Sequence, residues 1–322
     1  MSELINLFLS PDTKQELNLI NNELVSKDGK NKYQIEEDIY KFVSKNKIEL
    51  KTSSVRDFYL DFSFPNYNEF DSLEKFIRKM SNNFFIKELM TNINPKHKVL
   101  EFGCGTGQLG NFLAATGHSQ IVSADLSINS LKLANKFKKE NNITGVDFVE
   151  TDIFNHCFKE KVFDIIITNG VLHHTKDPYL AFKNLIALLK DDGIIVLVLY
   201  NKISRLKNSL IKYLAKIFGD KAISAFDKIY KSKNGLAAQA WKMDQYFHPL
   251  EKRYTFSDIH DWFNKNDIKF INSIPSYNNK IKIFEEVESI GDNIDRFNIQ
   301  VKDLIENDEG GLFIFIGKKI KK

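Results

Sequence analysis

Three glycines at alternate positions follow an acidic residue near the middle of this chain, in the order Glu101-x-Gly103-x-Gly105-x-Gly107. An apolar segment precedes them. Glycine adopts backbone dihedrals that other residues avoid, and it lets the backbone approach a ligand closely. The helix expected next presents free backbone N–H donors in its first turn. The spacing therefore predicts a loop that binds a nucleotide-like cofactor.

The loop by itself is compatible with two classes of cofactor. The order Gly105-x-Gly107-x-x-Gly110 fits the fingerprint of dinucleotide-binding folds, in which a pyrophosphate lies on a helix N-terminus. The overlapping pattern that starts at Glu101 resembles the loop of Rossmann-like, class I methyltransferases that depend on S-adenosylmethionine (SAM). In that family the acid suits the cationic amino group of a cofactor without phosphate. Later segments must distinguish the two classes.

Two further acids follow apolar segments and are expected at strand ends. Asp125 ends residues 121–125, and Asp152 follows residues 146–149. A carboxylate at the first position can accept both ribose hydroxyls of either cofactor class, or it can cap the helix expected near Ser127. By the methyltransferase resemblance, the second carboxylate accepts from the adenine amino group. Its alternative is an ordinary turn acid.

The fourth landmark, residues 163–178, is an expected strand that runs into a loop with two histidines. It resembles methyltransferase motif four, which lies beside the transferring methyl group. Four landmarks in this order favour SAM over a nicotinamide dinucleotide. The resemblance implies that Asn169 and Gly170 meet the cofactor through backbone atoms. The predicted cofactor-binding residues are therefore Glu101, Gly103, Gly105, Gly107, Asp125, Leu126, Asp152, Ile153, Asn169 and Gly170.

A group of bacterial methyltransferases resembles the chain over residues 58–275, and the core also resembles quinone-biosynthesis and other small-molecule methyltransferases. The segments that carry this resemblance are residues 64–67, 169–178, 199–201 and 244–251. It implies a fold and a cofactor, but it does not identify the methyl acceptor.

Methyl transfer requires a nucleophile held in line with the departing sulfur, and an oxygen or nitrogen acceptor also needs a base. Histidine suits this role because its ordinary pKa of ~6.5 lies near neutral pH. His174 is the first candidate because it aligns with the motif-four histidine of related enzymes; alternatively it orients the loop backbone, a structural role also expected of His173. His248 is the second candidate, unless its segment only docks an insertion onto the core. The predicted substrate contacts are Tyr67, Tyr200, Gln245, Tyr246 and Glu251, with core packing as the alternative for Tyr67.

Short apolar segments alternate with helical ones from residue 99 onward, a pattern typical of a parallel sheet covered on both faces. We predict an α/β fold with a Rossmann-like, seven-stranded, mostly parallel sheet and an antiparallel last strand. The expected strands are 99–102, 120–125, 146–149, 163–168, 194–200, 268–273 and 311–317. The expected helices are 107–116, 128–140, 178–190 and 256–265. Asp177 and Pro178 form a helix start, and Asp191–Gly193 a turn.

Three regions are predicted: a β-rich module over 1–48, an aromatic-rich linker and helix over 49–98, and the SAM-binding domain over 99–322. That domain carries insertions at about 201–255, helical and after strand five, and at about 276–310. The first region resembles the small zinc-ribbon-like module of some methyltransferases, but it lacks the cysteines. Metal binding is therefore not expected of it. The alternative is a simple extension with a hairpin at Asp28-Gly29.

Composition indicates an ordinary globular protein of 322 residues, with 43% hydrophobic residues and a net charge of +4. That charge makes no case for nonspecific nucleic-acid binding. Cys104 and Cys157 can form neither a disulfide framework nor a zinc site, so no metal is expected and the cytoplasm is the default location. The N-terminus has no signal-peptide pattern, and the longest apolar run, 194–200, is too short to span a bilayer.

The first insertion carries apolar residues at helical spacing, surrounded by the basic residues Lys202, Arg205, Lys207, Lys212 and Lys216. The apolar residues are Ile203, Leu206, Leu210, Leu214, Ile217 and Phe218. Such a stripe packs on the protein's own core or on a dimer partner, or it contacts a membrane surface and a lipid-linked acceptor.

The leading functional hypothesis is a SAM-dependent methyltransferase that acts on an oxygen or nitrogen atom of a small molecule, including glycan- or lipid-linked ones. The alternatives are an NAD(P)-dependent oxidoreductase, a non-catalytic SAM-binding protein and an RNA methyltransferase. The oligomeric state is not indicated by the sequence.

Overall fold

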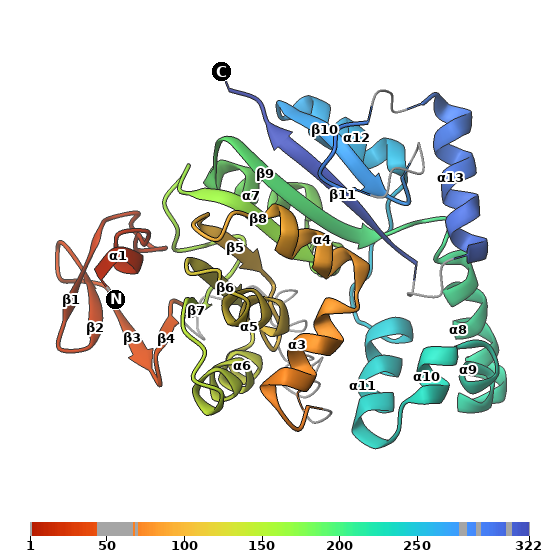
Figure 1. The fold of residues 1–322 in the computed structure, drawn as a ribbon, viewed down its shortest axis with the longest axis horizontal. Coiled ribbons are helices and arrows are strands. Elements are labelled where there is room, and N and C mark those ends of the chain that lie inside the picture. The colour runs from red at the N-terminus through yellow and green to blue at the C-terminus, as the bar shows by residue number, and fades with distance from the viewer. Residues whose placement is uncertain are drawn as a thin grey trace.

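A single mixed sheet runs through the computed structural model, which describes residues 2–43, 67, 70–276, 282–287, 291–306 and 311–321. Within these residues the sheet has eleven strands in the order β1-β2-β3-β4-β7-β6-β5-β8-β9-β11-β10. Figure 1 shows it crossing the molecule with helices in front of it and behind it.

The core of the sheet is parallel, as predicted. It comprises β7 (Val146–Glu150), β6 (Ile121–Asp125), β5 (Val99–Phe102), β8 (Phe163–Asn169) and β9 (Leu189–Tyr200), paired in that order. The next two strands, β11 (Leu312–Lys319) and β10 (Ile268–Ile274), are antiparallel to their neighbours. The α/β fold with a predominantly parallel core and an antiparallel terminal strand is confirmed.

Buried hydrophobic side chains form two main clusters, one on each face of the sheet. Helices α7 (Pro178–Leu188) and α12 (Phe256–Lys265) contribute to the first cluster through residues such as Phe182 and Phe263. The second cluster includes α3 (Leu73–Ser81), α4 (Phe84–Asn92), α5 (Gln108–Ala115) and α6 (Ile128–Glu140). Because both faces are covered, the central strands are almost continuously apolar.

Local signals set several helix boundaries. The Asp177 side chain accepts a hydrogen bond from the Leu180 N–H, and Pro178 occupies the first turn of α7. One expected boundary is wrong: β9 begins at Leu189, so the predicted turn at Asp191–Gly193 lies within the strand. The register with β8 shifts there, from Phe163 opposite Leu189 to Ile165 opposite Ile194. The extra residues are accommodated as an irregularity in a continuing strand.

The N-terminal segment is β-rich and continues the sheet. It contains α1 (Ser2–Ile5), β1 (Leu17–Ile20), β2 (Glu23–Ser26), β3 (Lys32–Glu36) and β4 (Ile39–Lys41). The β2–β3 hairpin includes Gly29 in a left-handed conformation, as its Asp-Gly turn predicts. β4 pairs in parallel with β7. The ribbon-like character suggested by the resemblance is not shown.

Two helical segments interrupt the sheet after β9. Helices α8 (Leu206–Phe218), α9 (Asp220–Phe226), α10 (Lys228–Ser232) and α11 (Gly235–Tyr246) follow β9 directly, and α13 (Asn293–Glu306) lies between β10 and β11. The helical insertion after the fifth strand of the core is confirmed. Among the described residues, no helix combines the length and the apolar character needed to cross a membrane.

Candidate active site

The predicted cofactor residues gather at the carboxyl edge of the parallel strands. Glu101 lies in β5, Asp125 ends β6, Asp152 follows β7 and Asn169 ends β8. The chain proceeds from β5 to β6 and β7 on one side, then returns to pair β8 with the other side of β5. This reversal of strand order creates a crevice outside the strand ends, where open α/β sheets bind ligands.

The glycine loop needs glycine for steric reasons. Gly103 has a φ of 78°, and a Cβ atom there would lie 2.1 Å from Cγ2 of Val171. Gly107 has a φ of 67°, and its Cβ would lie 2.8 Å from Cβ of Ala134. A side chain at either position would displace the loop from β8 or α6. The loop therefore packs closely against Val171 and Ala134.

Asp125 ties this loop to the next helix. Its Oδ2 accepts a hydrogen bond of 2.8 Å from the Gly105 N–H, and its Oδ1 accepts one of 2.8 Å from the Ser127 N–H. Ser127, rather than Asp125, caps α6 through its own side chain. Burial raises the pKa of the Asp125 carboxyl above its ordinary value. Each oxygen has a second lone pair, so the carboxylate can still accept from a ligand hydroxyl. Leu126, the next predicted contact, is half-buried.

Glu101 supports the loop from inside the protein. Its Oε2 accepts hydrogen bonds from Oγ of Ser123 at 2.9 Å and from the Gly110 N–H at 3.1 Å. The side chain is buried, and burial raises its pKa to about 8. These contacts join β5, β6 and α5. A direct contact to a cofactor stays a prediction.

Tyr67 also packs against the glycine loop. Its hydroxyl donates to the Thr106 carbonyl at 2.8 Å and accepts from Nδ2 of Asn111 at 2.8 Å. Its ring stacks on Phe137 of α6, with centroids 4.0 Å apart. These contacts match the core-packing alternative, and a substrate contact stays a prediction.

The other predicted cofactor residues follow β7 or lie at the end of β8. Oδ1 of Asp152 accepts a hydrogen bond of 2.9 Å from the Phe154 N–H, which shapes the turn after β7. Ile153 is buried, and its carbonyl accepts from Nδ2 of Asn184 at 2.9 Å. Asn169 is exposed, and Gly170 has a φ of 75° with no atom within 4 Å of a Cβ placed there. The backbone after β8 is therefore open to a ligand.

The two candidate bases meet in the structure. His174 lies in a short helix, Leu172–His174, directly after β8, and its ring centroid lies 3.6 Å from that of His248. Nδ1 of His174 is 2.7 Å from the carbonyl of Leu250, a residue 76 positions further along the chain. With Nδ1 donating to that carbonyl, Nε2 of a neutral ring is left as an acceptor.

Burial keeps both rings uncharged. It lowers the pKa of His174 to about 4 and that of His248 to about 3, the latter with a contribution from His174. His173 has a different role: its ring stacks on Tyr200 at 3.8 Å, and its Nδ1 accepts from the Tyr200 N–H at 3.2 Å. This bond fits the structural role expected of His173.

A buried arginine that the sequence did not single out joins three predicted substrate residues. Arg205 has no exposed surface. Its Nη1 donates to Oε1 of Gln245 at 2.7 Å, and its Nη2 donates to Oε2 of Glu251 at 2.8 Å. The guanidinium lies 3.9 Å over the Tyr200 ring, whose hydroxyl accepts from Nε2 of Gln245 at 3.1 Å.

This network also sets the charge of Glu251. Burial opposes ionisation, but the charges of Arg205 and Arg253 outweigh it and hold the pKa of Glu251 below its ordinary value. In the sequence, Arg205 is one of several cations around the apolar stripe. Its position shortly after the strand that ends at Tyr200 was the sequence signal that could have assigned it to the site.

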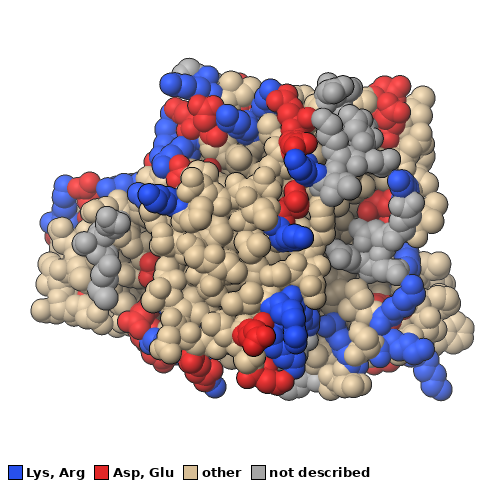
Figure 2. Space-filling model, in the orientation of Figure 1, with Lys and Arg blue, Asp and Glu red and all other residues tan. Residues whose placement is uncertain are grey.

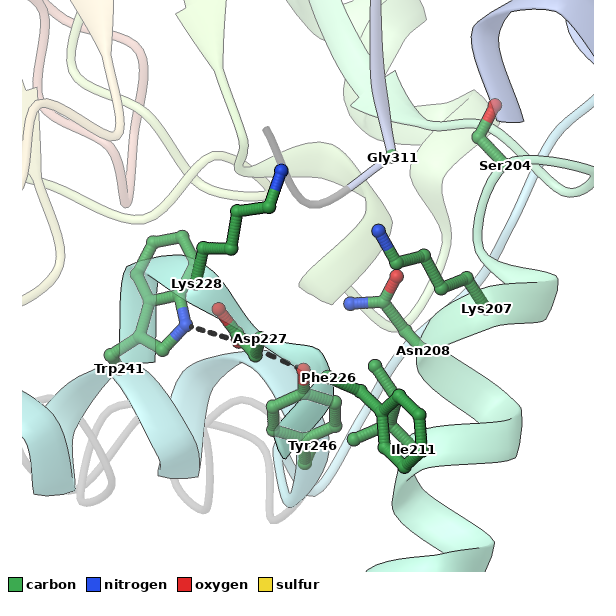
Figure 3. A pocket seen from close by; sticks show the side chains of 10 residues that line it. All are labelled: Ser204, Lys207, Asn208, Ile211, Phe226, Asp227, Lys228, Trp241, Tyr246 and Gly311. Carbon is green, nitrogen blue, oxygen red and sulfur yellow. Dashed lines mark hydrogen bonds between the residues drawn. The ribbon is translucent and has the colours of Figure 1, made fainter. Parts of the chain in front are cut away.

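Tyr246 lies apart from its neighbour Gln245. Figure 3 shows it in a recess between the insertion helices, where its hydroxyl donates to Oδ2 of Asp227 at 2.8 Å. Nε1 of Trp241 donates to the same oxygen at 2.8 Å. The rest of this recess is lined by Ser204, Lys207, Asn208, Ile211, Phe226, Lys228 and Gly311. Gln245 and Tyr246 therefore face different surroundings.

No group of three or more His, Cys, Asp and Glu side chains in the described part of the chain is arranged to hold a metal ion. Both cysteines are buried and free.

Comparison with known proteins supports the class of this site. Residues 93–268 match the family model described as "Methyltransferase domain". The ubiquinone biosynthesis O-methyltransferase of Actinobacillus pleuropneumoniae serotype 5b is 31% identical over 128 residues, which are 38% of this chain and 51% of that protein. Phosphoethanolamine N-methyltransferase 1 of Zea mays is 30% identical over 121 residues, covering 37% of this chain and 23% of that protein. The chain thus spans about half of the first relative and less of the second.

Among solved structures, PKMT2 from Rickettsia typhi in complex with AdoHcy has a TM-score of 0.51 and 16% identity. The match covers 76% of this chain and 52% of that one. At this identity the likeness supports the fold alone.

Proposed function

The chain belongs to the methyltransferase-domain family, and from that premise we propose that it transfers a methyl group from SAM to an oxygen or nitrogen atom of a small-molecule acceptor. It carries a class I SAM-dependent methyltransferase domain. The named relatives are an O-methyltransferase and an N-methyltransferase, which supports these two kinds of acceptor atom.

The residues at the carboxyl edge fit SAM by their chemistry. Asp125 supplies acceptor oxygens for a pair of hydroxyls, and Asp152 supplies one for an exocyclic amino group. The left-handed glycine loop and the open backbone at Gly170 leave room for close approach. We propose that these residues hold the nucleoside end, and that Asn169 and the loop backbone hold the amino-acid end.

The paired histidines are the observation that carries the proposed mechanism. When bound, SAM supplies an electrophilic methyl group on a positively charged sulfur. Neutral His174, with Nδ1 directed at the Leu250 carbonyl, takes the acceptor proton at Nε2. His248, in contact with the same ring, orients it, while Arg205 holds Tyr200, Gln245 and Glu251 in place around the acceptor.

The cofactor assignment is tested by calorimetric titration with S-adenosylhomocysteine (SAH), with NADH and NADPH as controls. We expect saturable binding of SAH that falls about 100-fold in Asp125→Ala, because the carboxylate loses both its loop contact and its ligand contact. Binding of a nicotinamide cofactor without binding of SAH would overturn the proposal.

The base is tested with SAM carrying a labelled methyl group and a panel of small-molecule alcohols, phenols and amines. We expect His174→Asn to lower kcat by about 100-fold or more while SAH affinity is retained. The matched variant His248→Asn should lower kcat less, because His248 acts through His174. If both variants keep the full rate, neither histidine is the base.

A further inference from the structure

The apolar stripe of α8 faces away from the protein. Leu206, Leu210, Tyr213 and Ile217 recur every three or four residues, so they share one face of the helix. Leu210 is 60% exposed and Ile217 is 57% exposed. The opposite face is the buried one, with Ile211 and Ala215 packed against the insertion. Packing on the protein's own core accounts for Leu214, which is half-buried against the same cluster, but not for these four residues.

A second helix at the same edge of the molecule has the same arrangement. In α13, Ile294, Phe297 and Ile305 are exposed, whereas Gln300 and Asp303 are buried. Asp303 accepts a hydrogen bond from the hydroxyl of Ser204, immediately before α8. Figure 1 shows α13 and α8 one after the other along this edge.

Cations accompany the stripe on α8. The helix contains Lys207, Lys212 and Lys216 and no acidic residue. Lys216 is exposed, Lys207 is exposed at the recess of Figure 3, and Lys212 is half-buried with its Nζ 5.9 Å from the Phe247 ring. Figure 2 shows Lys and Arg side chains at the lower right, where Figure 1 places the insertion helices. A net charge of only +4 for the whole chain makes this local excess of cations distinctive.

We propose that the α8 surface, comprising Leu206, Leu210, Tyr213, Ile217 and Phe218 with Lys216, docks the protein on an anionic lipid bilayer. The apolar side chains enter the boundary between headgroups and acyl chains, and Lys216 contacts a lipid phosphate. A helix with a high apolar moment and cations beside its apolar face is the ordinary means of such binding. It lies in the plane of the interface and does not span the membrane.

Charge favours lipid over a second copy of this chain. A symmetric dimer would bring the same surface of two copies together. Packing α8 on α8 would oppose their lysines, and the helix offers no acidic partner for them. An anionic bilayer instead supplies complementary charge and an apolar layer together.

The test is flotation of the 322-residue chain with two kinds of vesicle: phosphatidylcholine alone, and phosphatidylcholine mixed with phosphatidylglycerol. We expect binding to the anionic vesicles that is at least tenfold tighter and that weakens as salt is added. The double variant Leu210→Glu/Ile217→Glu should lose about tenfold or more of that affinity. Lys216→Gln should lose about fivefold.

The matched control is Ile20→Glu/Leu133→Glu, which places the same charges at two exposed apolar residues elsewhere. It should bind vesicles like the unmodified protein. Circular dichroism of every variant reports an intact fold, and vesicle binding requires neither SAH binding nor methyl transfer, so this proposal and the proposed function can fail separately. Absence of binding to anionic vesicles overturns the inference. So does a dimer, seen by sedimentation velocity, that the α8 double variant converts to monomer.

Discussion

Removal of Arg205, the buried arginine that joins the predicted acceptor residues, should lower both the stability of the protein and its affinity for the acceptor. Arg205→Met replaces the guanidinium by an apolar side chain, which removes the donor to both Gln245 oxygens and one of the two donors to Glu251. Breaking a buried ion pair by removing one partner costs about 3–5 kcal/mol. Glu251 keeps Arg253, whose Nε lies 2.6 Å from Oε1. We therefore expect a loss of about 3 kcal/mol in the free energy of unfolding, at the lower end of that range.

Urea unfolding followed by circular dichroism measures this loss, with Arg253→Met as the matched control. Arg253 contacts the same carboxylate but is partly exposed, so its removal should cost less. In the Arg205→Met background, Glu251→Gln should restore part of the stability, because it removes a buried charge that has lost a partner. The coupling energy of the two changes should be about 1–3 kcal/mol.

The function should change selectively as well. Arg205 contacts Tyr200 and Gln245, two of the predicted acceptor residues, so Arg205→Met should raise the acceptor KM while SAH affinity is retained. If Arg205→Met unfolds no more easily than Arg253→Met, or if the changes at Arg205 and Glu251 simply add, the proposed network does not hold the site together.

Three further predictions follow from the same geometry. Gly103→Ala should weaken SAH binding and lower the free energy of unfolding in urea by about 2–4 kcal/mol. The new side chain must adopt a left-handed backbone conformation and would overlap with Val171. A loss below about 1 kcal/mol would mean that the loop can move to accommodate the methyl group. The folded-state pKa of His174, about 4, lies below its unfolded value, so its contribution to stability is complete above pH ~6.5 and is lost as pH falls toward 4. Between pH 7 and pH 5 we expect the protonation of His174 to lower the free energy of unfolding by about 2 kcal/mol. His174→Asn should therefore make the free energy of unfolding less dependent on pH in this range. For Glu101 the sign is opposite: its folded-state pKa of about 8 lies above the unfolded value, so its contribution is complete below pH ~4.5 and is lost as pH rises to 8. Glu101→Gln keeps the acceptor for Gly110 but cannot ionise, and it should gain stability over the unmodified protein across that range; parallel pH profiles would contradict this.

Local patterns in the sequence determined the core of the fold. Short apolar runs predicted the parallel strands, and the acids and glycines that follow them marked one edge of the sheet. Parallel strands connected by helices bring their carboxyl ends together, so Glu101, Gly103, Asp125 and Asp152 could be assigned to one crevice without knowing any distance. The start of α7 was equally local, because Asp177 and Pro178 act within a single turn.

Contacts between distant segments were decided by the tertiary structure. Periodicity reports which face of an element is apolar, but it does not report which other element covers that face. The pairing of β4 with β7, the meeting of His174 with His248 and the burial of Arg205 all depend on such contacts. The stripe on α8 is the clearest case. Its spacing is the same whether it packs inward or outward, and only the structure shows that Leu214 packs with Ile211 while Leu210 and Ile217 face solvent.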